Sequence, residues 1–582
     1  MNNSEIQKLH ETIESLKREN SRLHKSVKDK NYGLVWMDVP EAFEKESENK
    51  LPILKEVKEK AIVNDDGKPT HILIEGENYH ALTCLNYTHK EKIDIIYIDP
   101  PYNTGNDGFK YKDKRFLTKY PDGTDVPKDS PFRHSYWLSF MSKRLELAKN
   151  LLKDTGVIFI SIDDNEVAQL KLLCDSIFGE VNFVGQWHWF KSATPPNLSH
   201  KIKKNIEYVI GYEKQKNNTK YRGIKKVSKS DDPITKPQNT VKILTFPPQT
   251  INFKVPDITV KTGIYGTKTF PNRLLNELTV ENGKNKNEVS FENRFVWTQG
   301  KLDEELKNKT LINCSKSLVI SYKKGNYAEE VPPNLIDESV GVETTEEAGK
   351  RLLEMFNEKV FDYPKPVSLI SYILNFKKEQ KQDSVILDFF AGTGTTAQSV
   401  LELNKEDGGN RQYIICTNNE NEICEKVTYI RNEKIINGYT KPNKEKIKGF
   451  GNSLKYYKAA FIGENDIANS NDEDTAKLAH HAGELLALAE NTLYEVEQTE
   501  YFQIFKSNEK YTAIYFREEF SEFEQFASKV EELQMPVSIY VFSWGNQSEF
   551  EAEFEHIGNA IVKSIPQPIL EIYKSIYNLI SQ

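Results

Sequence analysis

The stretch 384–396, SVILDFFAGTGTT, decides the fold. Its apolar residues up to 390 predict a buried strand, Gly392 and Gly394 form a tight turn, and a helix is predicted over 395–403. Glycine adopts positive φ and lets a ligand approach the backbone. The first turn of a helix offers free N–H groups to a carboxylate or phosphate. The stretch therefore indicates a strand–turn–helix unit that holds half of a nucleoside-binding site.

Glu420 helps to identify the class of ligand that this turn could bind. It follows Gly394 by 26 residues, at the tip of the next predicted strand, 412–418, where an acid can accept hydrogen bonds from both ribose hydroxyls. The turn lacks the third glycine of the dinucleotide fingerprint and the GK[ST] of a phosphate-binding loop. A nucleoside without a polyphosphate, such as S-adenosylmethionine, therefore fits better than NAD or ATP. A turn used only for packing remains the alternative on these residues alone.

A second motif lies nearly three hundred residues upstream, in DIIYIDPPYNTGN, 94–106. The predicted strand 93–98 ends at Asp99 because the two prolines that follow donate no backbone N–H. The exocyclic amine of adenine is a poor nucleophile, and a site can help by accepting both of its hydrogens. The Asp99 carboxylate and the Pro100 carbonyl offer two such acceptors, and Tyr102 offers a ring for a flipped base.

The role expected of Asp99 is first to orient and stabilise the amine and second to act as a general base. A plain strand-ending turn is the alternative for this motif. The glycine turn and Glu420, placed on the same α/β pattern, argue against it.

Buried strands alternate with helices on both sides of these motifs, which predicts an α/β fold with a mostly parallel sheet. The expected strands are 72–74, 93–98, 156–163, 206–211, 384–390 and 412–418. The expected helices are 79–85, 135–153, 165–174, 367–374 and 395–403.

The remaining segments differ in texture and charge. The net charge of the chain is −8, but residues 191–230 hold eleven Lys and Arg against two Glu. This basic stretch suits contacts with DNA phosphates, and a solvated lysine face is the alternative. The candidate DNA-binding residues are Trp187, near the start of the stretch, and Lys201, Lys203, Lys204, Lys225 and Lys226. Residues 1–30 predict an N-terminal helix with a short heptad seam, either a packed amphipathic helix or a coiled coil.

Composition bounds the class of protein. The sequence has no apolar run of 18 residues and no apolar signal core at its start, so we expect no membrane span. Its five cysteines are scattered without a CxxC pair, which argues against a disulfide framework or a zinc site and for a reducing cytosol. No metal is expected.

The chain resembles the Mod (DNA methyltransferase) subunit of type III restriction–modification systems, amino-methyltransferases of the β group. The resemblance is strongest over 71–190 and 360–440, in LIEGENYHALTCLNYTHKEKIDIIYIDPPYNTGN, RHSYWLSFMSKRLELAKNLL, GVIFISIDDNE, YPKPVSLI and DFFAGTGTTAQSVLELN. In that family the DPPY block precedes the FxGxG block, with the target-recognition domain between them. The order here is the same.

The resemblance implies a Rossmann-like methyltransferase sheet with circularly permuted motif order. It would consist of a catalytic half, 31–190, an inserted target-recognition domain, 191–345, and a cofactor-binding half, 346–440. A C-terminal acidic α+β domain, 441–582, would make dimer or partner contacts.

The same resemblance assigns roles to individual residues. Asp99, Pro100, Pro101 and Tyr102 would serve the target base and methyl transfer. Residues that would hold S-adenosylmethionine are Asp388, Phe390, Gly392, Gly394 and Glu420, with Lys365 and Pro366 near its methionine end and Glu77 and Asn78 near its adenine.

The activity implied is transfer of a methyl group to adenine N6 in double-stranded DNA, by base flipping. The resemblance also implies a homodimer, a restriction subunit as partner, and a bacterial cytosolic location on the nucleoid. Cytosine-N4 methylation, which usually has Ser in place of Asp99, and a catalytically silent DNA-binding subunit are the alternatives. RNA or protein-amide methylation is disfavoured, because those enzymes generally place Asn before Pro-Pro-Tyr and the cofactor block first.

Overall fold

The structure is a computed structural model of the 582-residue chain. It describes residue 17 and residues 34–41, 50–64, 66–105, 113–194, 201–217, 219–223, 231–267, 271–324, 330–377, 383–463, 472–516, 522–542 and 548–570. The helix predicted over 1–30 lies outside these residues, apart from Lys17. Contacts divide the chain into two compact units, residues 1–221 with 333–582, and residues 222–332.

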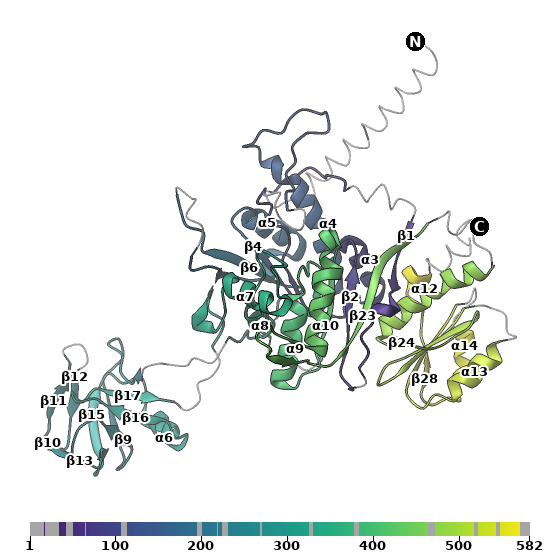
Figure 1. Ribbon diagram of the computed structural model, residues 1–582. Helices are drawn as coiled ribbons and strands as arrows, with labels where there is room; N and C mark the ends of the chain where they lie inside the picture. Colours follow the sequence, from purple (N-terminus) through teal and green to yellow (C-terminus); the bar gives the residue numbers. More distant parts are fainter. Residues whose placement is uncertain are drawn as a thin grey trace. The chain divides into compact units, whose positions relative to one another are not determined.

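A ten-stranded mixed sheet is the centre of the first unit (Figure 1). Its order is β1 (Lys50–Glu56), β23 (Ser453–Gly463), β2 (Thr70–Glu75), β20 (Gln412–Thr417), β19 (Val385–Asp388), β3 (Ile93–Ile98), β4 (Leu152–Ile162), β6 (Ile206–Glu213), β5 (Phe183–Phe190) and β18 (Leu335–Ile336). The strands from β23 to β4 are parallel. The strands that carry the two motifs, β3 and β19, are therefore neighbours and point the same way.

Helices cover both faces of the central strands (Figure 1). On one face lie α3 (Asn78–Thr88), α4 (Ser135–Leu151) and α5 (Val167–Phe178). On the other lie α7 (Thr345–Phe356), α8 (Val367–Leu374), α9 (Thr395–Asp407) and α10 (Ile430–Asn437). Because side chains alternate along a strand, Ile96 and Ile98 of β3 face one layer, and Ile95 and Tyr97 face the other.

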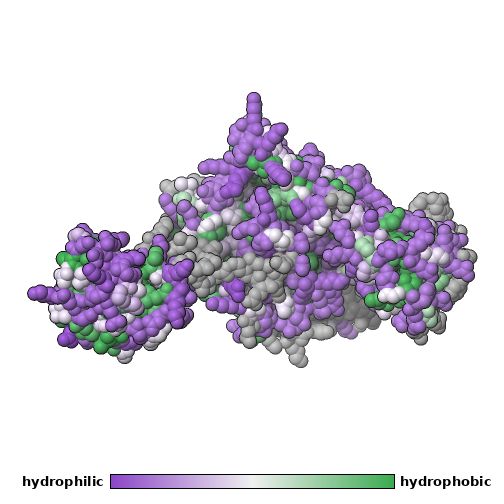
Figure 2. All heavy atoms as spheres, turned by 90° about the horizontal axis from the view of Figure 1, so that it is seen from below, coloured by the Kyte–Doolittle hydropathy of each residue, from purple (hydrophilic) through white to green (hydrophobic). Residues whose placement is uncertain are grey.

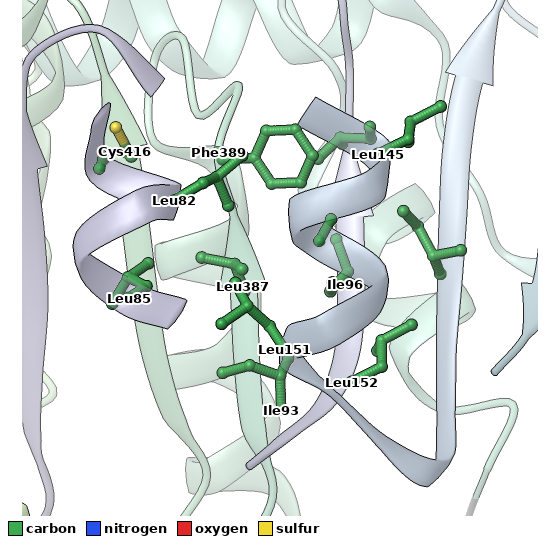
Figure 3. Packing of buried hydrophobic residues seen from close by; sticks show 14 of the residues in the cluster. Leu82, Leu85, Ile93, Ile96, Leu145, Leu151, Leu152, Leu387, Phe389 and Cys416 are labelled. Atoms are coloured by element: carbon green, nitrogen blue, oxygen red, sulfur yellow. The ribbon is translucent and has the colours of Figure 1, made fainter. Parts of the chain in front are cut away.

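Close packing fixes the first of these layers. Figure 3 shows leucines of α3 and α4 converging on side chains of β3 and β19; those labelled are Leu82, Leu85, Leu145, Leu151, Ile93, Ile96 and Leu387. All are fully buried. These predicted helices and strands are confirmed, with boundaries shifted by a few residues. The sheet is mixed rather than mostly parallel at its edges, where β1, β6 and β5 run antiparallel to neighbours.

The large sheet extends past residue 441, where a separate C-terminal domain was predicted to begin. Strand β23 pairs with β2 and β1, after a hairpin of β21 (Gly438–Thr440) and β22 (Lys446–Lys448). A second, five-stranded sheet follows, in the order β24 (Tyr494–Gln498), β25 (Phe502–Lys506), β26 (Tyr511–Tyr515), β27 (Val537–Val541) and β28 (Ala560–Val562). Its helices are α12 (Asp472–Glu490), α13 (Phe523–Glu531) and α14 (Ser548–Phe554), and α12 packs against β1 and α3.

The unit 222–332 is a small β structure with its own core. One sheet has the order β10 (Ile258–Val260), β13 (Leu278–Glu281), β14 (Lys284–Asn285), β9 (Ile251–Phe253), β16 (Leu311–Cys314), β17 (Ile320–Lys323), β7 (Asp232–Pro233). The other has the order β11 (Gly263–Gly266), β12 (Pro271–Leu274), β15 (Val289–Asn293), β8 (Lys242–Phe246). Helix α6 (Gln299–Lys307) accompanies them.

This unit is narrower than the predicted insert 191–345, because β6 and β18, which lie within the predicted bounds, belong to the large sheet. Its residues 222–332 contain nineteen Lys and Arg against twelve Asp and Glu, so it is basic within an acidic chain. Figure 2 shows a mainly hydrophilic surface with small exposed hydrophobic groups, which in this unit include Val241, Ile243, Ile264 and Leu311. Across the described residues, no helix is long and apolar enough to span a membrane.

Candidate active site

A cavity of about 820 Å³ opens at the carboxyl ends of β3, β19 and β20. Both sequence motifs line it: Asp99, Pro100, Pro101 and Tyr102 from one, and Asp388, Phe390 and Gly392 from the other. The carboxyl edge of a parallel sheet is where open α/β folds bind ligands. The two motifs therefore meet at this edge of the sheet.

The Asp-Pro-Pro-Tyr turn is held from outside by hydrogen bonds. The indole of Trp137 in α4 donates to the Pro101 carbonyl over 2.7 Å. Asp113 accepts from the backbone N–H groups of Tyr102 (3.0 Å) and Thr104 (2.7 Å). Asn103 has a positive φ of 57°. These contacts fix the turn at a point where its prolines supply no N–H donor of their own.

Buried Glu166 stabilises the strained residue of this turn. Its Oε1 accepts from Asn103 Nδ2 over 2.6 Å and lies 2.7 Å from Nδ1 of His134. Burial raises the pKa of Glu166, although the bonds from His134 and Asn103 oppose it. Nothing in the local sequence pairs Glu166 with a turn more than sixty residues earlier, so sequence reasoning missed it.

Tyr102 is linked to two carboxylates. Its hydroxyl donates to Asp99 Oδ1 over 2.7 Å and lies 3.2 Å from Glu207 Oε2. Burial, with the charges of Asp99 and Glu207, raises the pKa of Tyr102 well above its ordinary value. The phenol is therefore neutral at physiological pH and acts as a donor. Glu207 comes from β6 and was not predicted as a site residue.

Lys365 lies with the catalytic motif. Its Nζ is 2.8 and 3.0 Å from the two carboxylate oxygens of Asp99 and 3.3 Å from Glu207. Burial alone would lower its pKa, but the charges of Asp99 and Glu207 outweigh burial and raise it. Lys365 lines the cavity beside Asp99, and its place near the methionine end of the cofactor stays a prediction. Pro366 is buried at the start of α8 and is not among the residues that line the cavity.

The glycine turn adopts the backbone that its residues allow. Gly392 and Gly394 have φ of 50° and 79°, in the left-handed region. Thr428 lies in the helical turn Cys424–Tyr429, just before α10, and its hydroxyl donates to the Gly392 carbonyl over 2.6 Å. Asp388 accepts from the Phe390 N–H and the Thr396 hydroxyl. Burial nevertheless raises the pKa of Asp388 to about 7.

The other predicted cofactor residues line the same cavity. Asn78 donates to the Phe389 carbonyl over 2.9 Å, and Arg144 contacts Glu77 over 2.6 Å. Arg144 is fully buried and also pairs with Glu41. A carboxylate–guanidinium network therefore holds Glu77 and Asn78 in place beside the cavity. Glu420 lies just past β20, in a short 3₁₀ turn over Glu420–Glu422, with its side chain exposed.

Asp163 is a further acid at this edge. It follows β4 and lines the cavity, and burial raises its pKa to about 6. The sequence carried a signal for it, since the predicted strand 156–163 ends in this acid. Asp163 belongs to no motif, but its position at the carboxyl end of a predicted strand could have identified it as a site residue.

The residues predicted to contact DNA differ in their exposure. Trp187 is a core residue, packed against Phe159 and Phe376 with ring centroids 5.8 and 5.1 Å away. Its prediction as a DNA contact is therefore wrong, because the indole faces the helix layer beneath the sheet. Lys201, Lys203 and Lys204 are exposed, and Lys204 lines the cavity. Lys225 and Lys226 lie outside the described residues.

Comparison with known proteins decides the family. The model of a family described as DNA methylase, of the N6/N4 type, matches residues 93–430, from the start of β3 to the start of α10. This is more than half of the chain, and it contains both motifs. The chain belongs to this family.

Proteins from bacteria and a phage are similar to this chain over about 60% of its length. The StyLTI Mod subunit of Salmonella typhimurium is 33% identical over 397 residues, 62% of this chain and 55% of that protein. The EcoPI Mod subunit of Escherichia phage P1 is 32% identical, over 60% and 58%. M.KpnI of Klebsiella pneumoniae, a type II methyltransferase, is 32% identical, over 59% and 79%. The chain spans a little over half the length of the two Mod relatives.

Solved structures resemble this methylase only loosely. A cytosine-N4-specific PvuII DNA methyltransferase covers 61% of this chain and 85% of its own, with 11% identity and a TM-score of 0.30. M1.HpyAVI bound to S-adenosylmethionine covers 62% and 97%, with 13% identity and a TM-score of 0.28. Scores this low add nothing to the family assignment.

The methyl donor of this family is S-adenosylmethionine, and the cavity fits it. A Cβ built on Gly392 would meet only the Phe390 carbonyl oxygen, at 3.9 Å, so this glycine leaves open the space on its cavity side. The α9 N-terminus, with Thr395 and Thr396, faces the same space, where free N–H groups suit a carboxylate. Glu420, just past the end of β20, lines the same cavity.

Proposed function

We propose that the chain methylates adenine N6 at a short site in double-stranded DNA, with S-adenosylmethionine as methyl donor, as the modification subunit of a type III restriction–modification system. The observation that carries this proposal is the meeting of Asp99 and the Gly392 turn in one cavity. One motif suits the amine to be methylated, and the other suits the donor.

The choice of adenine rests on Asp99. An ionised carboxylate accepts hydrogen bonds and donates none, so it suits an amine with two hydrogens to give. The Asp99 carboxylate takes one hydrogen and the Pro100 carbonyl takes the other, which draws the nitrogen towards tetrahedral geometry. Cytosine also has an exocyclic amine, so N4 methylation remains the second candidate. Its enzymes usually have Ser where this chain has Asp99.

The residues that line the cavity have different roles in methyl transfer. S-adenosylmethionine, when bound, supplies an electrophilic methyl group and leaves as the neutral thioether. Asp99 orients the target amine and stabilises the positive charge that develops on its nitrogen. The methylated amine then gives up one proton, to water or to Asp99. Phe390, Glu420 and the glycine turn hold the donor in place.

A base inside a duplex cannot reach this cavity, so the target must leave the stack. Tyr102 supplies a ring on which it can stack, and such stacking is worth about 1–3 kcal/mol per base. The hydroxyl of Tyr102 is anchored on Asp99, so the ring has a fixed position before DNA binds. That preorganisation supports stacking as its role.

Recognition of the DNA site is assigned to the unit 222–332. Its position between the two motifs and its excess of seven positive charges support this role. Basic side chains neutralise phosphates and position a protein, and base contacts then specify the sequence. Lys201, Lys203 and Lys204 would add phosphate contacts beside the cavity.

The StyLTI and EcoPI relatives are named as Mod subunits of type III restriction–modification enzymes, which supports a restriction subunit as partner. The assembly proposed here is a homodimer of Mod chains that joins this subunit in the bacterial cytosol. The C-terminal sheet, β24–β28, offers a surface for such contacts outside the family match. Sedimentation of the purified chain would test the dimer.

The proposal is tested by mass spectrometry of nucleosides. The purified chain is incubated with S-adenosylmethionine and genomic DNA from a methylation-free host, and the DNA is hydrolysed. N6-methyldeoxyadenosine is the expected product. N4-methyldeoxycytidine would favour the second candidate, and no methylated nucleoside would indicate a silent DNA-binding subunit.

A further inference from the structure

Four charged side chains form a cluster at the wall of the cavity. Lys365 lies between Asp99, at 2.8 and 3.0 Å, and Glu207, at 3.3 Å. Lys191 contacts the other oxygen of Glu207 over 3.0 Å. The side chains of Lys365 and Glu207 are only 10% and 12% exposed. The two lysines balance the two acids, and the charges of Lys365 and Lys191 outweigh burial to lower the pKa of Glu207.

The ammonium group of Lys365 occupies the place that a target base needs. It donates to both oxygens of Asp99, the carboxylate that must accept from the target amine. It also lies 5.0 Å from the ring centroid of Tyr102, over the face on which a base would stack. A base that stacks on Tyr102 with its amine on Asp99 therefore requires the volume and the acceptors that Lys365 now holds.

Glu207 offers the displaced ammonium a second partner. A buried ammonium left without a counter-charge is strongly destabilising, so Lys365 cannot simply be pushed away from Asp99. Glu207 Oε2 already lies within 3.3 Å of it. Lys191 holds the other Glu207 oxygen in place. A small movement of the lysine side chain exchanges one carboxylate for the other.

We propose that Lys365 is a positioning residue that occupies Asp99 until the amine of the target base replaces it, and that Glu207 then holds the ammonium group. This inference rests on the proposed function. Before DNA binds, Lys365 keeps the Asp99 carboxylate oriented. During transfer it stays on Glu207, and its return to Asp99 displaces the methylated base.

A double-mutant cycle separates this role from a structural one, because only coupled residues show non-additive effects. The readout is the initial rate of tritium transfer from S-adenosylmethionine into unmethylated genomic DNA. Glu207→Gln removes the second partner, so Lys365 stays on Asp99 and the rate falls about a hundredfold. Lys365→Met removes the competitor and the positioning charge, so the rate falls about tenfold, and Lys365→Arg restores at least a third of the wild-type rate.

The double variant decides the outcome. With Lys365 absent, no ammonium group competes for Asp99 and none needs to move to Glu207, so Glu207→Gln/Lys365→Met is expected to be at least fivefold faster than Glu207→Gln alone. A double variant as slow as Glu207→Gln, or slower, would overturn the inference. Should Glu207→Gln not fold, Glu207→Asp, which keeps the charge but shortens its reach, replaces it in the same cycle with the same criterion.

Lys153 provides the matched control. Its Nζ also contacts both oxygens of an aspartate, Asp94, over 2.8 and 2.9 Å, but at the opposite end of β3. Lys153→Met should leave the rate within twofold of wild type, and a tenfold fall would overturn the assignment of the Lys365 effect to the site. A wild-type chain without activity would overturn the proposed function as well, whereas an active wild type with a slow double variant would overturn this inference alone.

Discussion

The hydroxyl group of Tyr102 donates a hydrogen bond to Oδ1 of Asp99 over 2.7 Å, three residues along the same turn. The two side chains that the proposed chemistry needs are therefore joined before substrate arrives. The turn that carries them is anchored by Trp137, Asp113 and Glu166, which come from three other segments. An acid and a ring fixed in this way can act on one base together.

Asp99→Asn should abolish methyl transfer while the cofactor still binds. The amide keeps the shape of the side chain but replaces one acceptor with a donor, which faces the target amine and repels its hydrogens. We expect the rate to fall at least a hundredfold, the effect typical of removing one hydrogen bond that stabilises a transition state. Isothermal titration should give a Kd for S-adenosylmethionine within threefold of wild type. A variant with more than a tenth of the activity would contradict the assigned role.

Tyr102→Phe and Tyr102→Ala should differ. Phenylalanine keeps the stacking ring and loses one hydrogen bond, so activity should fall less than tenfold. Alanine loses the ring, and a stacking contribution of about 1–3 kcal/mol corresponds to roughly a 5- to 150-fold loss. The measurement is kcat/KM for DNA with each variant. Equal losses in both would show that the hydroxyl, and not the ring, carries the function.

Gly392→Val should weaken cofactor binding. The side chain would enter the space that the glycine leaves open in the cavity, so the Kd of S-adenosylmethionine should rise at least tenfold. Gly408→Val is the control: its φ of 70° is equally strained, at the other end of α9, and a Cβ there meets nothing within 4 Å. The control should lower the melting temperature to a similar extent and leave the Kd unchanged. Equal Kd values for the two variants would contradict the assignment of the turn.

Lys201→Gln and Lys203→Gln should weaken DNA binding without regard to sequence. Removing one lysine that neutralises a phosphate reduces the slope of log K against log salt by about 1. Fluorescence anisotropy with a random duplex, at several salt concentrations, measures this slope. Lys446→Gln, an exposed lysine of the β21–β22 hairpin, is the control. If all three variants give the same slope as wild type, the lysines are a solvated face.

Glu490 should make the stability of the C-terminal sheet depend on pH. Burial would raise its pKa, but bonds from Lys510, Lys563 and Tyr540 outweigh burial and lower it to about 2. A depressed folded-state pKa stabilises above the unfolded value of about 4.3, and this stability is lost as the pH falls towards 2. The difference corresponds to about 3 kcal/mol. Glu490→Gln should lower the free energy of unfolding at pH 7 but not at pH 2, and Glu555→Gln, on the surface of the same domain, should change neither.

The sequence predicted those parts of the fold that local patterns determine. Apolar runs identified β3, β4, β19 and β20. The residues that end two of these runs, Asp99 after β3 and Gly392 after β19, identified the two motifs that line the cavity. Partners from distant segments left no such signal. Glu207 and Lys365 join Asp99 from 108 and 266 residues away, and a carboxylate or an ammonium in a sequence does not say which charge it will meet.

Trp187, in contrast, was predicted as a site residue and is not one. It lies beside a basic stretch and was predicted to contact DNA, but β5 places it on the buried face, against Phe159 and Phe376. The bounds of the insert and of the C-terminal domain shifted for a similar reason. A strand was expected over 206–211, where β6 lies, but the sequence did not show that β6, β18 and β23 pair with the large sheet. That pairing, rather than composition, assigns these three strands to it.

Methylation of adenine in DNA at the cavity that holds Asp99 can be measured in living cells. The most direct measurement is a map of modified bases across the genome of a methylation-free bacterial host, by long-read sequencing, with the wild-type chain and with Asp99→Asn expressed separately. We expect N6-methyladenine at one short sequence motif with the wild type and none with the variant. No modified adenine with the wild type, or modification that survives Asp99→Asn, would contradict it.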